Sequence, residues 1–237
     1  MALPKIYNWE RIRAALKLLS EAFPDEFQNW VLIGGGASWF FREQLKNAND
    51  PDFRVPVYSA DEETIWLSKD VDFMGLTEAE GAALLGSPFK PETHTISFRG
   101  LEVDFLEEGF RLTLELALRN PREVRTSDFV FYVVDPSVLY SEKSALVASK
   151  SRPQDRLHRS LLAEFLKYEL CTDVEQPAEL SARDWVARAK TIKTADLEFF
   201  ARDEKFARRL ALGIAKLPPL HKPLKHWAKH HLPGYTD

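Results

Sequence analysis

The patterns typical of β-strands occur only in the first part of the chain and stop at an Asp-Pro pair, residues 135–136. Before that pair, short apolar runs alternate with helical spacings and turn residues, a mixture typical of a sheet with helices packed against it. After it, helical periodicity continues and no strand pattern returns. The sequence therefore predicts an α+β protein, with a mixed α/β domain in residues 1–135 and a helical domain in residues 136–237.

The boundaries of the expected elements follow from apolar periodicity and from the placement of glycine and proline. Strands are expected at residues 30–33, 71–74, 94–98, 101–106 and 129–134. Helices are expected at residues 9–22, 37–46, 78–85, 111–119, 137–150, 154–170, 181–193 and 195–216. Thr77 and Glu80 form a capping-box pattern before the helix at 78–85. Polar residues 47–60, which include two prolines, are expected to form a loop or an inserted hairpin, and acidic residues 172–179 a linker.

The composition limits the classes of protein to which the chain can belong. Its 237 residues are 45% hydrophobic and 29% charged, which is ordinary for a globular protein. No apolar run approaches the roughly 20 residues that a membrane-spanning helix needs. Residues 1–13 mix charges into a helical pattern and do not resemble a secretion leader, so we expect a cytoplasmic protein with no membrane partner. The single cysteine, Cys171, excludes an internal disulfide and a multi-cysteine zinc site.

Charge is distributed unevenly along the chain. The net charge is −4, yet residues 201–237 contain eight Lys or Arg against three Asp or Glu. His226 and His230 stand at helical spacing in this tail, but the neighbouring lysines disfavour a metal ion there. A basic surface that includes Trp227 suits contact with RNA or phosphate, although a solvated basic helix explains the same pattern.

Two strand-like runs carry the residues most informative about chemistry: Ser-Lys-Asp-Val-Asp-Phe at 68–73 and Leu-Glu-Val-Asp-Phe at 101–105. Because successive side chains of a strand point to opposite faces, Asp70 and Asp72 share one face, and Asp104 lies opposite an apolar face. Converging carboxylates repel each other unless a cation compensates them, and Mg²⁺ or Mn²⁺ suits such a site. We predict a metal site here, with Asp104 as the base for an attacking hydroxyl. The alternative is a solvated sheet face.

Three glycines, residues 34–36, follow the first expected strand and precede a helix. They can simply allow the helix to pack closely against the strand. Alternatively, their backbone N–H groups and the helix N-terminus approach phosphate oxygens, and Ser38 adds a hydroxyl. The spacing matches neither a phosphate-binding loop with Gly-Lys-Ser/Thr nor a dinucleotide fingerprint, so this motif alone leaves both interpretations open.

Taken together, the motifs at residues 32–38, 68–73 and 101–105 resemble the nucleotidyltransferase superfamily shared with DNA polymerase beta. Within that superfamily, the likeness is closest to the AbiEii-type nucleotidyltransferase toxins. The resemblance covers roughly residues 28–160 and implies a nucleotidyltransferase-like mixed sheet with flanking helices. The C-terminal helices are left without a counterpart.

The resemblance also implies roles for individual residues. In the family, the glycine turn holds the triphosphate, the Asp pair and a third acidic residue bind metal, and a lysine that opens a helix contacts the triphosphate. Arg and Asp residues follow that lysine. The corresponding residues are Gly35, Gly36, Ser38, Asp70, Asp72, Asp104, Lys143, Arg152 and Asp155. Without this context, Lys143 would be expected on a solvated helix surface. The chain departs from the family in the long segment between residues 38 and 70 and in Trp66, which stands where an arginine is often found.

The resulting expectation is a metal-dependent enzyme that transfers NMP from an NTP to an acceptor hydroxyl and releases pyrophosphate. The resemblance implies a tRNA 3′ end as the acceptor and a toxin that a partner antitoxin holds in check. Two alternatives stay open. One is a small molecule or a protein hydroxyl as the acceptor, and the other is a degenerate nucleotidyltransferase fold that binds without catalysis.

Overall fold

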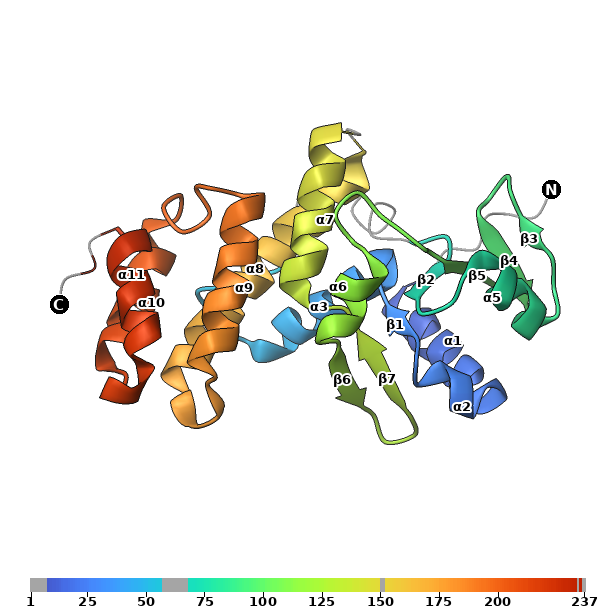
Figure 1. Cartoon of the computed structure of the whole chain (residues 1–237), viewed down its shortest axis with the longest axis horizontal. Coiled ribbons are helices and arrows are strands. Elements are labelled where there is room, and N and C mark those ends of the chain that lie inside the picture. The colour runs from blue at the N-terminus through green and yellow to red at the C-terminus, as the bar shows by residue number, and fades with distance from the viewer. Residues whose placement is uncertain (1–7, 57–67, 150–151, 234, 236–237) are drawn as a thin grey trace.

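The structure, a computed structural model, describes residues 8–56, 68–149, 152–233 and 235. A sheet with flanking helices lies at one end of the molecule and a stack of helices at the other (Figure 1). The strands are β1 (Val31–Leu32), β2 (Val71–Met74), β3 (Phe89–Lys90), β4 (Thr95–Phe98), β5 (Leu101–Phe105), β6 (Arg122–Arg125) and β7 (Val130–Val133). The helices are α1 (Trp9–Ala22), α2 (Pro24–Phe27), α3 (Gly34–Ala48), α5 (Glu78–Leu85), α6 (Leu114–Arg119), α7 (Pro136–Ser149), α8 (Pro153–Glu175), α9 (Ala182–Ala195), α10 (Glu204–Lys216) and α11 (Lys222–His231). The expected α+β class with a helical C-terminal part is confirmed.

Within the described residues, the seven strands form one mixed sheet in the order β3-β4-β5-β2-β1-β7-β6. β2 is parallel to β5 and β1 is parallel to β7, whereas the other neighbouring strands are antiparallel. The β2–β5 register places Asp72 directly beside Asp104. Their neighbours Val71 and Val103 are completely buried, so the two aspartates lie on the opposite face of the sheet.

Aromatic side chains form the core beneath these strands. The ring of Trp30 lies 5.0 Å from that of Phe105 and 5.5 Å from that of Phe73, measured between centroids. Phe27 of α2 meets Trp30 edge-on at 5.5 Å. Such rings bury a large apolar area, and a strand cannot slip by one residue without exposing its whole apolar side. The core therefore determines the face on which the aspartates emerge.

Local capping decides several helix ends, and these match the sequence expectation. Asn8 accepts a hydrogen bond from the Arg11 backbone N–H at 3.0 Å where α1 begins. Thr77 and Glu80 form the expected capping box of α5. Gly86, with φ at 64°, ends α5 in the left-handed region that glycine adopts without strain.

Other helix boundaries differ from the expectation. α3 begins at Gly34, not at residue 37, so the glycines form its first turn. α8 continues through part of the predicted linker to Glu175, whose carboxylate pairs with Arg209 of α10. α10 begins only at Glu204, where the Asp203 side chain caps it. Contacts at a helix terminus decide where the helix ends, and the spacing of apolar residues does not reveal them.

Two short strands have no counterpart in the sequence expectation. β6 alternates charged and apolar residues and forms by pairing with β7, and β3 is a two-residue strand paired with β4. Of the predicted loop or hairpin at 47–60, residues 49–56 contain neither helix nor strand. Residues 57–67, including Trp66, lie outside the described residues.

A network of half-buried ion pairs joins the sheet to the helical part. Arg122 of β6 pairs with Glu169 of α8, and Glu169 also accepts a bond from Arg188 of α9 at 2.7 Å. Burial lowers the pKa of Arg122, but the charges of Glu169 and Asp135 raise it above its usual value. The predicted domain boundary falls between β7 and α7, and the division into two domains remains a prediction. No helix in the described ranges is long and apolar enough to cross a bilayer.

Candidate functional site

A pocket of about 760 Å³ lies where β2 and β5 face the start of α3 and helices α7 and α8. Its lining combines an aliphatic part with many charged side chains. The charged residues are Lys69, Asp70, Asp72, Asp104, Glu108, Glu142, Lys143, Arg152 and Asp155. Segments far apart in the sequence thus meet in one pocket, and the predicted aspartates and Lys143 are among them.

The three aspartates crowd negative charge in this pocket. Burial raises the pKa of Asp72 well above its usual value, and the charges of Asp70 and Asp104 raise it further. Burial raises the pKa of Asp104 to about 7, and the charge of Asp70 contributes. Burial also raises the pKa of Asp70, although a hydrogen bond from Ser68 opposes this. The protein therefore holds carboxylates where their charged form is unfavourable.

The beginning of α3 faces these carboxylates directly. The Gly35 backbone N–H donates to Asp72 Oδ2 at 3.3 Å. A side chain at Gly34 would place its Cβ 1.9 Å from the same oxygen, and Gly34 has φ at 61°. Both features exclude other residues there, so Gly34 serves the close approach of the helix to Asp72.

Two of the predicted phosphate-binding residues lie elsewhere. Gly36 packs against Leu32 and Ile12 in the core. Ser38 is completely buried, and its hydroxyl donates to the Gly34 carbonyl at 3.1 Å. Neither residue lines the pocket. The physical reason is that the glycines are the first turn of a helix, whose successive residues point in different directions.

Lys143 of α7 is buried in the pocket wall, not solvated on a helix surface. Its Nζ donates to Asp155 Oδ1 at 2.9 Å, and Arg152 Nε donates to Asp155 Oδ2 at 2.6 Å. Burial would raise the pKa of Asp155, but these two cations lower it below its usual value. The charge of Lys143 also lowers the pKa of Asp72, which places positive charge beside the carboxylates.

Several pocket residues escaped the sequence interpretation, among them His158 and Glu142. His158 of α8 is buried, and burial together with the charge of Lys143 lowers its pKa to about 3, so its ring is neutral. Its position three residues after Asp155 on a helix was a signal that could have found it. Glu142 of α7 accepts bonds from three consecutive backbone N–H groups, of residues 110–112. No local pattern indicates that long-range contact.

The other acidic side chain of β5, Glu102, does not join the site. Glu102 of β5 accepts hydrogen bonds from Thr95 at 2.9 Å and from Ser97 at 2.8 Å, and it pairs with Lys90 at 3.2 Å. Burial opposes but does not cancel these contacts, which lower its pKa. Glu102 does not line the pocket and is a structural carboxylate.

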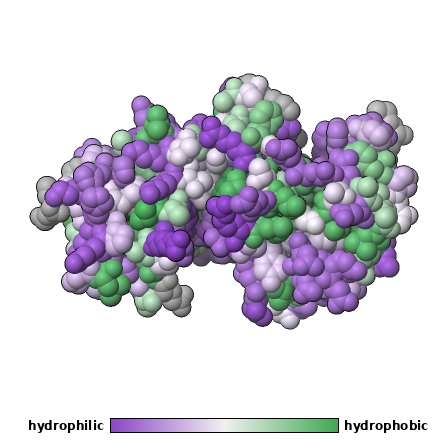
Figure 2. All heavy atoms as spheres, in the orientation of Figure 1, coloured by the Kyte–Doolittle hydropathy of each residue, from purple (hydrophilic) through white to green (hydrophobic). Residues whose placement is uncertain are grey.

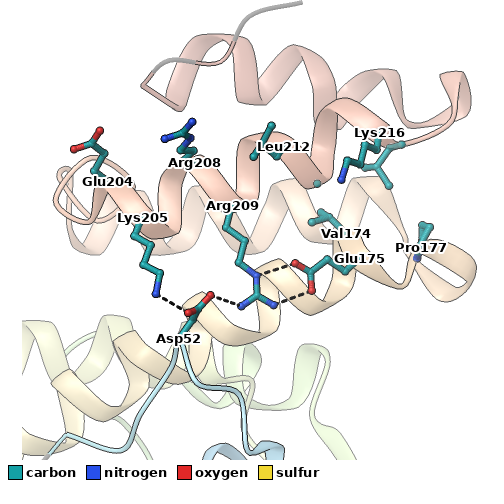
Figure 3. A pocket seen from close by; sticks show the side chains of 12 residues that line it. Asp52, Val174, Glu175, Pro177, Glu204, Lys205, Arg208, Arg209, Leu212 and Lys216 are labelled. Atoms are coloured by element: carbon teal, nitrogen blue, oxygen red, sulfur yellow. Dashed lines mark hydrogen bonds and ion pairs between the residues drawn. The ribbon is translucent and has the colours of Figure 1, made fainter.

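A second pocket, of about 960 Å³, lies at the other end of α8. Asp155 and Glu175 are separated by about 30 Å of helix at 1.5 Å per residue, so the two pockets are distinct. In this second pocket, Arg209 of α10 bridges Glu175 and Asp52 (Figure 3). It also donates to Asp50 at 3.0 Å. These ion pairs hold the segment after α3 against helices α8 and α10.

Replacing Arg209 by methionine is expected to lower the free energy of unfolding by roughly 1–3 kcal/mol, because carboxylates lose their shared donor while the apolar stem is kept. Urea denaturation measures this. Arg208→Met is the control, since the described residues offer Arg208 no ion pair, and its effect is expected to stay within about 0.5 kcal/mol. Equal effects of the two substitutions would contradict the bridging role.

Within the described parts of the chain, no three or more His, Cys, Asp or Glu side chains are gathered into a ready-made metal-binding group. This holds for the aspartate pocket and for the tail. In the tail, the rings of His226 and His230 lie 4.6 Å apart on α11. Burial and the charge of nearby Lys193 lower the pKa of His231, so positive charge is concentrated there.

The sequence matches no protein-family model and no curated protein. The structure is similar to the crystal structure of an antigenic nucleotidyltransferase-like protein from Paracoccidioides brasiliensis, with a TM-score of 0.50 and 9% sequence identity. The match covers 87% of this chain and 94% of that chain. At this identity, the likeness shows a nucleotidyltransferase-like fold and nothing further about activity. A closer relation to the AbiEii-type toxins remains a prediction.

Proposed function

We propose that the protein is a metal-dependent nucleotidyltransferase that moves NMP from an NTP to an acceptor hydroxyl. The observation that carries this proposal is the crowding of Asp70, Asp72 and Asp104 in one pocket of a nucleotidyltransferase-like fold. Burial raises the pKa of all three carboxyls, and charge repulsion adds to this at Asp72 and Asp104. A site that is unfavourable for the bare protein is best explained by a ligand that compensates the charge.

The donor chemistry fits Mg²⁺ or Mn²⁺. All three side chains offer carboxylate oxygens, which hard divalent cations prefer. The Gly35 amide donates to one oxygen of Asp72, Oδ2, and so orients this carboxylate at the start of α3. Bound there, the ion would stabilise the charge of the triphosphate and favour ionisation of the acceptor hydroxyl.

The remaining pocket residues have complementary roles in the proposed reaction. Asp104 accepts the proton of the acceptor hydroxyl. The acceptor oxygen bonds to the α-phosphorus, the bond from that phosphorus to the β-phosphate oxygen breaks, and pyrophosphate leaves. Lys143 and the N-terminus of α3 supply positive charge near the departing phosphates. This assignment retains Gly35 and Lys143 and omits Gly36 and Ser38.

Transfer of label tests the proposal directly. The protein is incubated with each α-labelled NTP, Mg²⁺ and total RNA, and label in RNA, protein and small molecules is separated. We expect label in RNA that depends on the metal. The absence of transfer from every NTP to any acceptor class would remove the enzymatic proposal and leave the non-catalytic binding module.

RNA is the proposed acceptor because the helical end of the molecule concentrates positive charge. Lys190, Lys193, His226 and His230 all act on the pKa of His231. Such a cluster is suited to phosphate groups of a nucleic acid. Two finer proposals are that the acceptor is a tRNA 3′ end and that the protein is a toxin under the control of an antitoxin. The same assay addresses them by identifying which RNA is labelled. Label confined to protein or small molecules would select the alternative acceptors.

A further inference from the structure

A large aromatic side chain stands exposed at the wall of the aspartate pocket. Phe110 lies in the segment between β5 and α6, lines the pocket and is 52% exposed. Leu114 and Leu118 of α6 are each 43% exposed, and hydrophobic residues appear near the middle of the face of the molecule over α6 (Figure 2). Of these three side chains, only Phe110 lines the pocket.

The backbone around Phe110 is held by a buried carboxylate. Glu142 is 6% exposed and accepts from the N–H groups of Phe110 at 3.0 Å, Arg111 at 2.6 Å and Leu112 at 2.9 Å. A Cβ at Gly109 would lie 2.8 Å from Glu142 Oε1, so the glycine allows the close approach. Charge-assisted bonds to backbone donors are strong, and three of them fix this segment.

The fixed segment presents an aromatic face beside aliphatic side chains. Leu112, Leu139 and Leu146 line the same pocket as Phe110. Exposure of a phenyl ring is unfavourable in water, and the Glu142 contacts hold its backbone beside the pocket. A flat ring with apolar faces, such as a nucleobase, matches a rigid aromatic side chain, and stacking of this kind tolerates all bases.

We propose that Phe110 is the stacking platform for the nucleobase of the NTP, and that Glu142 is the residue that positions it. This inference rests on the proposed function, because it places the base in the same pocket as the three aspartates. A pocket of about 760 Å³ has the size of a site for one small ligand. Since stacking grows with ring area, purine triphosphates bind more tightly than pyrimidine triphosphates.

Binding measurements with Phe110 variants test the platform. Phe110→Leu keeps an apolar side chain but removes the π-face, and it is expected to weaken Mg²⁺-ATP binding by about 5- to 150-fold, the range of base–aromatic stacking. Phe110→Trp is expected to retain binding. Mg²⁺-tripolyphosphate, which has no base, is expected to bind both variants and the wild type equally. Leu118→Ala is the matched control, since Leu118 is exposed but lies outside the pocket lining.

Glu142→Gln tests the positioning role. The variant is expected to reduce the preference for ATP over CTP while leaving tripolyphosphate binding intact, an effect that general destabilisation would not produce. Two results would overturn this inference alone. One is that Phe110→Leu binds ATP as tightly as the wild type does, and the other is that the variant loses ATP binding and tripolyphosphate binding equally. Failure of the wild type to bind any Mg²⁺-NTP would overturn the proposed function as well.

Discussion

Replacement of Asp72 by alanine is expected to lower nucleotidyl transfer by about 10³-fold or more. Asp72 lies directly beside Asp104 in the sheet, and the charges of Asp70 and Asp104 add to the effect of burial in raising its pKa. Its loss removes a ligand for the ion that would compensate the triphosphate, and preorganised electrostatic contacts of this kind carry much of an enzyme's rate enhancement. Single-turnover transfer of labelled NMP measures the effect.

Glu102→Gln provides the control for that experiment. Glu102 lies on the same strand as Asp104, but its carboxylate contacts Thr95, Ser97 and Lys90 and does not line the pocket. The rate of transfer is therefore expected to stay near that of the wild type. Wild-type activity in Asp72→Ala, or an equal loss in Glu102→Gln, would show that the pocket is not the catalytic centre.

Replacement of Asp104 by asparagine is expected to stabilise the metal-free protein at pH 8. The pKa of Asp104 is raised from 3.8 to about 7 in the folded state, so the folded protein binds this proton more tightly than the unfolded chain does. That contribution to stability is fully present below about pH 4 and is lost as pH rises through about 7. At 1.36 kcal/mol for each pKa unit, the rise from 3.8 to about 7 sets an upper limit of about 4 kcal/mol on the gain for the variant.

Urea denaturation in EDTA at pH 4 and pH 8 measures this effect. The difference between Asp104→Asn and the wild type is expected at pH 8 and nearly absent at pH 4. Mg²⁺ at pH 8 is expected to stabilise the wild type and not the variant. Glu102→Gln should have the opposite sign at pH 8, because the folded state lowers the pKa of Glu102. If Asp104→Asn proves no more stable than the wild type at pH 8, burial and the charge of Asp70 do not disfavour the ionised Asp104 side chain.

Much of the N-terminal architecture was predictable because its signals are local. Alternation in β2 and β5 predicted which side chains share a face, and the capping box predicted α5 residue by residue. The strand β6 was not predictable in this way, because its charged residues are stabilised by pairing with β7 and by the contact between Arg122 and Glu169. β7 follows β6 directly in the chain, but Glu169 lies 47 residues from Arg122, and no local pattern indicates that contact.

The candidate site likewise has residues that the sequence could identify and residues that it could not. The aspartates were identifiable from their spacing, whereas Ser38 was assigned to the pocket although the first turn of α3 directs it into the core. Glu142 could not be identified, because its partners are about 30 residues away and no periodic pattern links them. Spacing identifies residues on one element, but it does not determine which elements meet.

The sequence by itself determined the succession of an α/β part and a helical part, and the strand faces that carry Asp72 and Asp104, whereas Asp70 lies in the bend just before β2 and not on the strand. These follow from periodicity and capping, which act over a few residues. Only the tertiary structure decided that β2 and β5 are parallel neighbours, that Lys143 is buried beside them, and that Glu142 holds Phe110 at the pocket. Those contacts join segments far apart in the chain, and the packing of the common core determines which segments become neighbours.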